Sequence, residues 1–212
     1  MHDPAPTSSV LVLFGQSMLI GLSIAAPVGQ IGVLAIQRTL SDGRAAGLAT
    51  GIGAAFADAV YGAIGAFGVT SLVAWLLGLR LWLALFGGTY LLWLAWKIGT
   101  KPAVRSVAGD RPPASSLWRC AGSTFLLTLS NPTTILSFMA VFGALAGRAP
   151  AASPWAMVTG VLVGSALWWL ILAAGVGWLR ERFDARWQRA VNLASATLLG
   201  GLGLWQLGQL VP

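Results

Sequence analysis

The sequence predicts an all-α integral membrane protein with six transmembrane helices, arranged as an inverted repeat of three helices and three helices. Three observations predict this fold: the composition, the spacing of the apolar runs and a similarity between the two halves. Of the 212 residues, 57% are hydrophobic and only 9% are charged, whereas a soluble domain carries about 25% charged residues. Most of the chain is therefore expected to face lipid rather than water.

Six apolar runs have the length of transmembrane helices. They cover residues 10–36, 45–77, 81–98, 118–146, 155–179 and 190–210. A helix needs about 20 predominantly apolar residues to cross a bilayer, so the runs occupy most of the chain and leave no soluble catalytic domain. The runs contain no nucleophile–base pair and no cluster of metal ligands. We therefore predict that the protein is not an enzyme, and we expect no cofactor and no bound metal.

The basic residues predict the orientation in the membrane. Of the 13 Lys and Arg residues, all but Arg80 and Arg148 lie at or in the connections between runs one and two, three and four, and five and six. The positive-inside rule places these connections in the cytoplasm, so both termini are expected on the periplasmic or extracellular side. In this arrangement the net charge of +7 reflects orientation, and we expect no nucleic-acid partner.

The chain divides into two halves that resemble each other. Residues 99–117 are rich in proline, serine and charge, and we interpret them as a cytoplasmic linker between residues 1–98 and residues 118–212. At one constant offset Asp58 aligns with Ser165, and glycines, alanines and leucines around them align as well. Because each half has three spans, the second half crosses the membrane in the opposite direction to the first. Such inverted repeats place the substrate at their interface near the bilayer midplane.

Prolines interrupt the first and fourth runs at equivalent positions. Pro27 lies in "AAPVGQ" and Pro132 in "LSNPTT". Proline removes a backbone N–H and clashes with the preceding turn, and polar groups freed in this way persist in a membrane only where protein or a water-filled cavity satisfies them. We predict that helices one and four are broken at these prolines around a shared polar cavity. The alternative is that the prolines only kink two packed helices.

The residues beside both prolines are suited to a small polar substrate. Glycine allows close approach of a ligand to the backbone, whereas amide and hydroxyl groups offer hydrogen-bond donors and acceptors. A half-helix that begins at a break points its N–H groups at the cavity, which favours a substrate carboxylate. Together with the two prolines, the predicted binding residues here are Gly29, Gln30, Asn131, Thr133 and Thr134.

Asp58 is the one acidic residue deep inside an apolar run. A charge at the centre of a membrane helix costs at least about 2.5 kcal/mol, so such residues are functional candidates. Asp58 could carry a proton, hold the ammonium group of a substrate, or tie its helix to a neighbour through Tyr61. The aligned Ser165 is assigned to the same site. Because no basic residue lies deep inside a predicted run, we do not expect a salt bridge to Asp58.

Two segments carry a resemblance to a known family. Residues 27–68, "PVGQIGVLAIQRTLSDGRAAGLATGIGAAFADAVYGAIGAFG", and residues 128–138, "TLSNPTTILSF", resemble the LysE (lysine exporter) family of bacterial transporters. The resemblance implies an exporter of amino acids or similar small metabolites, driven by the proton gradient across the bacterial cytoplasmic membrane. It implies functional roles for Pro27, Gly29, Asp58, Asn131 and Pro132. The chain departs from the family at residue 30, where relatives commonly have a second proline and this chain has glutamine.

Two other functions remain open from the sequence. The protein could export another small solute or a cation, although one His, one Cys and one intramembrane Asp make a poor cation site. It could instead be a membrane protein that assembles with a partner, or with a second copy, through its glycine stripes. These stripes are formed by Gly43, Gly47 and Gly51 and by Gly160 and Gly164. An assembly module, however, needs neither a buried acid nor paired helix breaks.

Overall fold

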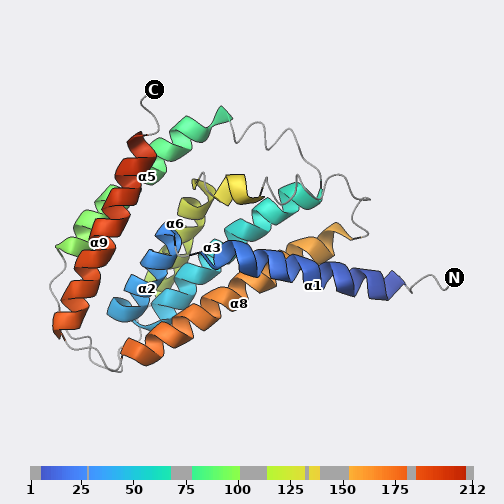
Figure 1. Ribbon diagram of the computed structural model, residues 1–212, viewed down its shortest axis with the longest axis horizontal. Helices are drawn as coiled ribbons and strands as arrows, with labels where there is room; N and C mark the ends of the chain where they lie inside the picture. The colour runs from blue at the N-terminus through green and yellow to red at the C-terminus, as the bar shows by residue number, and fades with distance from the viewer. Residues whose placement is uncertain are drawn as a thin grey trace.

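The computed structural model describes residues 6–27, 29–67, 78–100, 114–131, 134–138, 153–180 and 185–208. Within these residues the secondary structure is helical (Figure 1). The labelled helices are α1 (Pro6–Ala25), α2 (Gln30–Asp42), α3 (Arg44–Ala66), α5 (Arg80–Gly99), α6 (Ala114–Leu129), α8 (Pro154–Arg180) and α9 (Ala185–Gly208). A short helical segment at residues 134–138 follows α6.

The described part of the chain contains four helices that are long and apolar enough to cross a membrane, namely α3, α5, α8 and α9. The pair α1 and α2 adds a fifth candidate if it forms one broken span. The predicted fourth run corresponds to α6, which has 16 residues, and to residues 134–138. Residues 139–146 of that run lie outside the described residues. The protein is thus an all-helical membrane protein with four or five candidate spans, and the count of six stays a prediction.

The first apolar run is broken where proline predicts it. Helix α1 ends at Ala25 and α2 begins at Gln30, with an angle of 78° between the two helices. Proline has no N–H to continue the ladder, and the N–H of Gly29 donates to the Pro27 carbonyl at 2.9 Å instead. Gly29 has an extended backbone, and its carbonyl accepts the N–H of Val33 at 3.0 Å. The second predicted break, at Pro132, lies outside the described residues.

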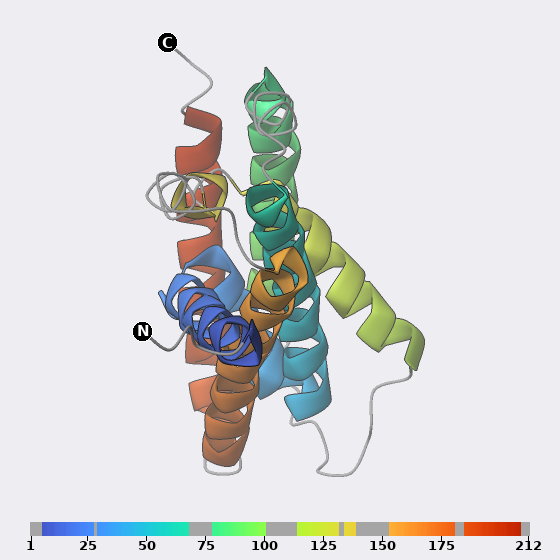
Figure 2. The same ribbon diagram turned by 90° about the vertical axis from the view of Figure 1, so that its right-hand side faces the viewer.

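The helices pack around α3 and α8. Helix α8 contacts α1, α2 and α3, whereas α3 also contacts α2 and α6, and α5 pairs with α9 along one side of the molecule (Figure 1). The main apolar core joins α2, α5 and α9 through Leu34, Leu91 and Leu199, all fully buried. Figure 2 shows that the turn between α2 and α3, the end of α8 and the starts of α6 and α9 lie toward the same end of the molecule.

Both glycine stripes make close helix contacts within the chain. A side chain at Gly160 or Gly164 of α8 would meet the backbone of α1, and one at Gly51 of α3 would meet the ring of Trp169. Small residues allow such approach, because helices in lipid associate by packing rather than by the hydrophobic effect. The prediction that the stripes pack closely against other helices is therefore confirmed.

Helix α8 contains glycines that pack tightly against another helix and glycines with open space around them, and alanine substitution distinguishes the two. We expect Gly164→Ala to destabilise the protein by about 1–3 kcal/mol, because the new Cβ overlaps the Met18 backbone, which cannot rotate away. Gly175 lies on the same helix, and no atom lies within 4 Å of where its Cβ would stand, so Gly175→Ala should not lower stability. Melting temperatures of the two variants in detergent test this, and equal values would contradict the packing.

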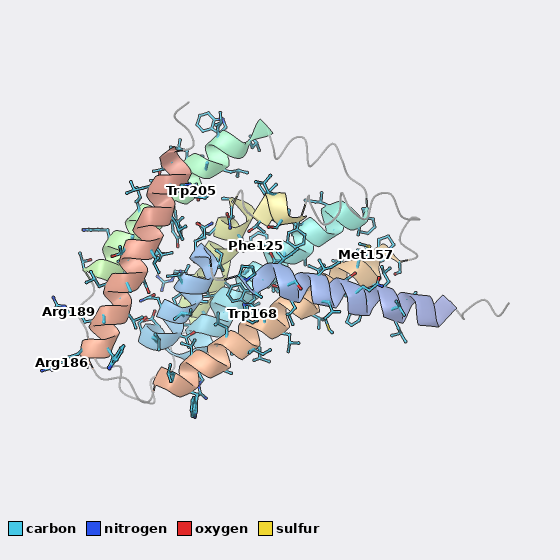
Figure 3. The ribbon with its side chains drawn as sticks, viewed as in Figure 1. Phe125, Met157, Trp168, Arg186, Arg189 and Trp205 are labelled. Atoms are coloured by element: carbon cyan, nitrogen blue, oxygen red, sulfur yellow. The ribbon has the colours of Figure 1, made fainter. Side chains whose placement is uncertain are left out.

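The surface is largely apolar, as expected in lipid. Exposed tryptophans lie near helix ends, as predicted for an interfacial belt: Trp82, Trp96, Trp118, Trp155 and Trp178. Figure 3 shows Arg186 and Arg189 at one end of α9 and Trp205 toward the other end. The two arginines therefore mark the end of the molecule at which α8 connects to α9.

Candidate functional site

Asp58 lies in the middle of α3 and is bonded to α8. Its side chain is 4% exposed, and its Oδ2 accepts a hydrogen bond from the Ser165 hydroxyl at 2.7 Å. One turn further along α8, the indole Nε1 of Trp169 donates to Ser165 Oγ at 3.2 Å. The hydrogen bonds thus run from an indole to a hydroxyl to a buried carboxyl group. The two residues that align between the halves, Asp58 and Ser165, are in direct contact.

Tyr61 contacts the end of α6, so the role left open for Asp58 of tying its helix to a neighbour through Tyr61 is not seen in the described residues; Asp58 contacts α8 through Ser165 instead. The Tyr61 hydroxyl donates to the carbonyl of Leu129 at 2.7 Å, and its ring stacks on Phe138 with 5.5 Å between centroids. Leu129 is the last residue of α6, and terminal carbonyls of a helix lack an intrahelical donor. Tyr61 therefore supplies a donor at the point where the helix stops.

Asn131 forms a turn at this point. Its N–H donates to the Thr128 carbonyl at 3.1 Å, and its own carbonyl accepts the N–H of Ile135 at 3.2 Å. The Asn131 side-chain amide also donates to the Thr134 hydroxyl at 3.0 Å. Two of the predicted binding residues, Asn131 and Thr134, are thus bonded to each other across the turn. The other two predicted residues of this segment, Pro132 and Thr133, lie outside the described residues.

The first break places its predicted residues in different environments. Pro27 and Gly29 are exposed, whereas Gln30 is buried at the start of α2. No atom lies within 4 Å of where a Cβ of Gly29 would stand. Among the described residues, Gly29 therefore has open space beside its backbone, and its role in binding stays a prediction.

Arg38 is a polar residue whose position the sequence analysis misjudged. We expected it in a connection, but it lies inside α2, and its side chain is 8% exposed. Its guanidinium bonds hydroxyl groups of α3 and α6, at Thr50, Ser123 and Thr124. The available signal was the presence of these hydroxyls in two apolar runs, because buried polar groups need partners.

Two buried polar atoms in the described residues have no hydrogen-bond partner: Oγ1 of Thr128 and Nε2 of Gln206. Gln206 Nε2 lies 2.8 Å from where a Cβ of Gly87 would stand, and Cβ of Ser130 lies 3.5 Å from the same point. An unpaired donor of α9 is therefore close to the end of α6. Such groups are rare in folded proteins.

Three known bacterial proteins are similar to this chain over most of its length. YahN, an uncharacterized membrane protein of Escherichia coli (strain K12), is 29% identical over 80% of this chain and 77% of its own length. ChpE, a chemotactic transduction protein of Pseudomonas aeruginosa, is 26% identical over 91% of this chain and 96% of its own. YcgF, a putative amino acid efflux protein of Bacillus subtilis (strain 168), is 28% identical over 88% and 91% respectively.

No solved structure matches the chain. The profile of the LysE type translocator family matches residues 22–208, which include the break at Pro27, the predicted break at Pro132, Asp58 and Ser165. The chain therefore belongs to the LysE type translocator family and is a multi-pass membrane transporter rather than an enzyme.

Proposed function

We propose that the protein exports amino acids, or closely related small metabolites, from the cytoplasm in exchange for protons. The observation that carries this proposal is Asp58, a buried carboxyl group in the middle of α3 whose hydrogen-bond partner in the described residues is the neutral hydroxyl of Ser165. A relative in Bacillus subtilis named as a putative amino acid efflux protein supports the substrate class.

The chemistry of Asp58 suits a coupled exchange. A buried carboxylate without a cation is costly, and either a proton or the ammonium group of an amino acid neutralises it. The proton and the amino acid then compete for the Asp58 carboxylate. Such competition is the simplest way to couple export of the amino acid to import of the proton. Ser165 donates to the carboxyl oxygen and fixes its orientation, and Trp169 fixes Ser165 in turn.

The helix breaks are proposed to bind the substrate carboxylate. Gly29 and Pro27 leave the start of α2 open, and the first turn of α2, from Gln30, presents N–H groups without intrahelical acceptors. On the other side, Asn131 and Thr134, together with Pro132 and Thr133, form the second half of this site in the proposal. The partners of the protein are then a small-molecule substrate and the lipid bilayer.

We further propose that residues 1–98 and 118–212 are two inverted halves of one transmembrane domain, joined by the linker at residues 99–117. The helix contacts support this arrangement. The pairs α3–α8 and α5–α9 each join helices that the repeat makes equivalent, and the α1–α8 contact has its counterpart in the α3–α6 contact. The bond between the aligned residues Asp58 and Ser165 supports it as well.

The proposed orientation places the α2–α3 turn and the α8–α9 connection in the cytoplasm and both termini outside. Its support is that the α2–α3 turn, the end of α8 and the start of α9 lie at one end of the molecule, where Arg186 and Arg189 also lie (Figures 2 and 3). The positive-inside rule assigns such an end to the cytoplasm. The bacterial relatives support a place in the bacterial cytoplasmic membrane.

An efflux assay tests the function. Cells that contain the protein, and cells with an empty vector, are loaded with a mixture of dipeptides, and the released amino acids are measured over time. We expect faster release of a subset of amino acids, and a protonophore should abolish the difference. Equal release from both cell types, with the protein shown to be folded in the membrane, would refute amino-acid export. Export of another solute and partner assembly would then be the functions to test.

The unpaired hydroxyl of Thr128 gives a second prediction. Thr128→Val keeps the shape of the side chain and removes a buried polar group without a partner, so the melting temperature should hold or rise. If the hydroxyl serves the substrate, export should fall about threefold to tenfold. Thr159→Val is the matched control, because the Thr159 hydroxyl is exposed and bonds its own helix. A lower melting temperature would contradict the lack of a partner for this hydroxyl, and export equal to that of the unmodified protein would exclude Thr128 from the substrate site.

A further inference from the structure

The guanidinium of Arg38 joins three helices at one point. Its Nη1 donates to the hydroxyls of Thr50 in α3 and Thr124 in α6, both at 3.0 Å, and to the Cys120 carbonyl at 3.1 Å. Its Nη2 donates to the hydroxyl of Ser123 at 3.1 Å. Arg38 belongs to α2, the helix that follows the break at Pro27. One side chain therefore fastens this half-helix to both α3 and α6.

The acceptors around Arg38 are all neutral. The hydroxyls of Thr50, Ser123 and Thr124 donate their own protons to backbone carbonyls three or four residues earlier in the same helix, at 2.8, 3.1 and 2.8 Å. Their lone pairs are thereby turned toward the guanidinium. This contact differs from a buried ion pair, because separating an ion pair leaves an uncompensated buried carboxylate behind. Water can replace a hydroxyl or a carbonyl as acceptor for a guanidinium.

The contact lies in the second half of α2, next to the turn that leads into α3. Close packing reinforces it, because Gly47 of α3 leaves room for the Thr39 side chain of α2. The α2–α3 turn lies at the end of the molecule that we assign to the cytoplasm (Figure 2). The hydrogen bonds of Arg38 to α3 and α6 are strong while water is excluded, and water can replace them. Such a contact between helices, which we call the junction, is suited to open and close.

We propose that Arg38 is a positioning residue that holds the cytoplasmic end of the transport path closed, by fastening α2 to α3 and α6. When that end opens, water replaces the three hydroxyls and the carbonyl, and α2 separates from α6. The inference rests on the proposed function, since only a transporter with alternating access needs such a junction. It assigns Arg38 a role that does not require contact with the substrate.

The chain carries its own probe of this junction. Cys120 is the single cysteine of the protein, it is half-buried, and its carbonyl accepts a bond from Arg38. In inside-out membrane vesicles, the rate at which a membrane-impermeant maleimide labels Cys120 reports how often the junction opens to the cytoplasmic side. We expect Arg38→Gln to raise this rate about tenfold, because the guanidinium bonds are lost. Arg38→Lys, which keeps the charge, should restore part of the protection.

Arg119→Gln is the matched control. Arg119 is the neighbour of Cys120, but it is exposed and bonds only the Ser115 carbonyl of its own helix among its described contacts. Its removal should leave the labelling rate within about twofold. Both substitutions remove one positive charge close to Cys120. A faster rate in Arg38→Gln alone therefore cannot come from the loss of charge.

Three results would overturn the proposal. They are an unchanged labelling rate in folded Arg38→Gln, an equal increase in Arg119→Gln, and no protection by lysine relative to glutamine. If Arg38→Gln does not fold, the labelling rate of Arg38→Lys tests the proposal instead. A labelling rate of Arg38→Lys equal to that of the unmodified protein would then contradict the proposal. If the protein exports amino acids but Arg38→Gln labels no faster than the unmodified protein, the role of Arg38 is refuted and the proposed function is not. If Arg38→Gln labels faster but no amino acid is exported, the proposed substrate is refuted and the role of Arg38 is supported.

Discussion

Asp58→Asn is expected to reduce amino-acid export by about 100-fold or more, because an intramembrane acid that exchanges protons or binds a cation cannot be replaced by a neutral amide. Asparagine has nearly the same volume, and its carbonyl oxygen can still accept the hydrogen bond from Ser165, which lies 2.7 Å from the carboxyl oxygen. The contact between α3 and α8 should therefore persist. Initial rates of release from dipeptide-loaded cells measure the effect.

Two comparisons separate a transport role from a structural one. Asp42→Asn removes an acidic group at the end of α2 and should leave export within about twofold, because the group lies outside the middle of the membrane. Ser165→Ala keeps the carboxyl group and loses one hydrogen bond, so we expect about a threefold to tenfold decrease. Full export by folded Asp58→Asn would reduce Asp58 to a helix contact and remove the main support for proton coupling.

Tyr61→Phe should produce the second large effect, a fall in the melting temperature. The Tyr61 hydroxyl donates to the terminal carbonyl of α6 at 2.7 Å, and its loss removes the donor that the described residues supply to this partly buried carbonyl, at a cost of about 1–3 kcal/mol. For a chain of this size each kcal/mol corresponds to about 2–4 °C. We also expect slower export, since the turn at Asn131 loses a support.

The chain offers a matched comparison for this substitution, because it has two tyrosines. Tyr90 of α5 contacts Trp93 through its ring, and no hydrogen bond of its hydroxyl is seen in the described residues. Tyr90→Phe should therefore change the melting temperature by less than about 2 °C. If both variants melt at the same temperature as the unmodified protein, the Tyr61 contact does not stabilise the helix end.

Local chemistry made several features predictable from the sequence. Proline cannot continue a helix, so Pro27 gave the position of the first break without any knowledge of the fold. Asp58 stood out because a carboxyl group is rare inside an apolar run. Ser165 could be assigned to the same site from its alignment with Asp58 in the proposed repeat, because inverted repeats place a binding site at their interface.

Tertiary contacts made other features unpredictable. Tyr61 is one turn from Asp58 along α3, and sequence distance suggested a bond between them, but the hydroxyl reaches across to the Leu129 carbonyl of α6. Arg38 looked like a connection residue because hydropathy ends the first apolar run before it. Helix α2 continues to Asp42, and hydroxyls of two other helices accept bonds from the guanidinium. Averaged hydropathy does not show such compensation between distant residues, and its signal lies only in the hydroxyls of the two partner runs.

The most direct measurement of the central claim uses purified protein in liposomes. The liposomes are loaded with an amino acid that the cells release, together with a pH-sensitive dye, and are diluted into buffer without amino acid at equal pH. The proposed antiport predicts that efflux of the amino acid drives protons inward and acidifies the lumen, and that Asp58→Asn shows neither flux. Efflux without acidification, or equal efflux from Asp58→Asn, would contradict proton-coupled export through Asp58.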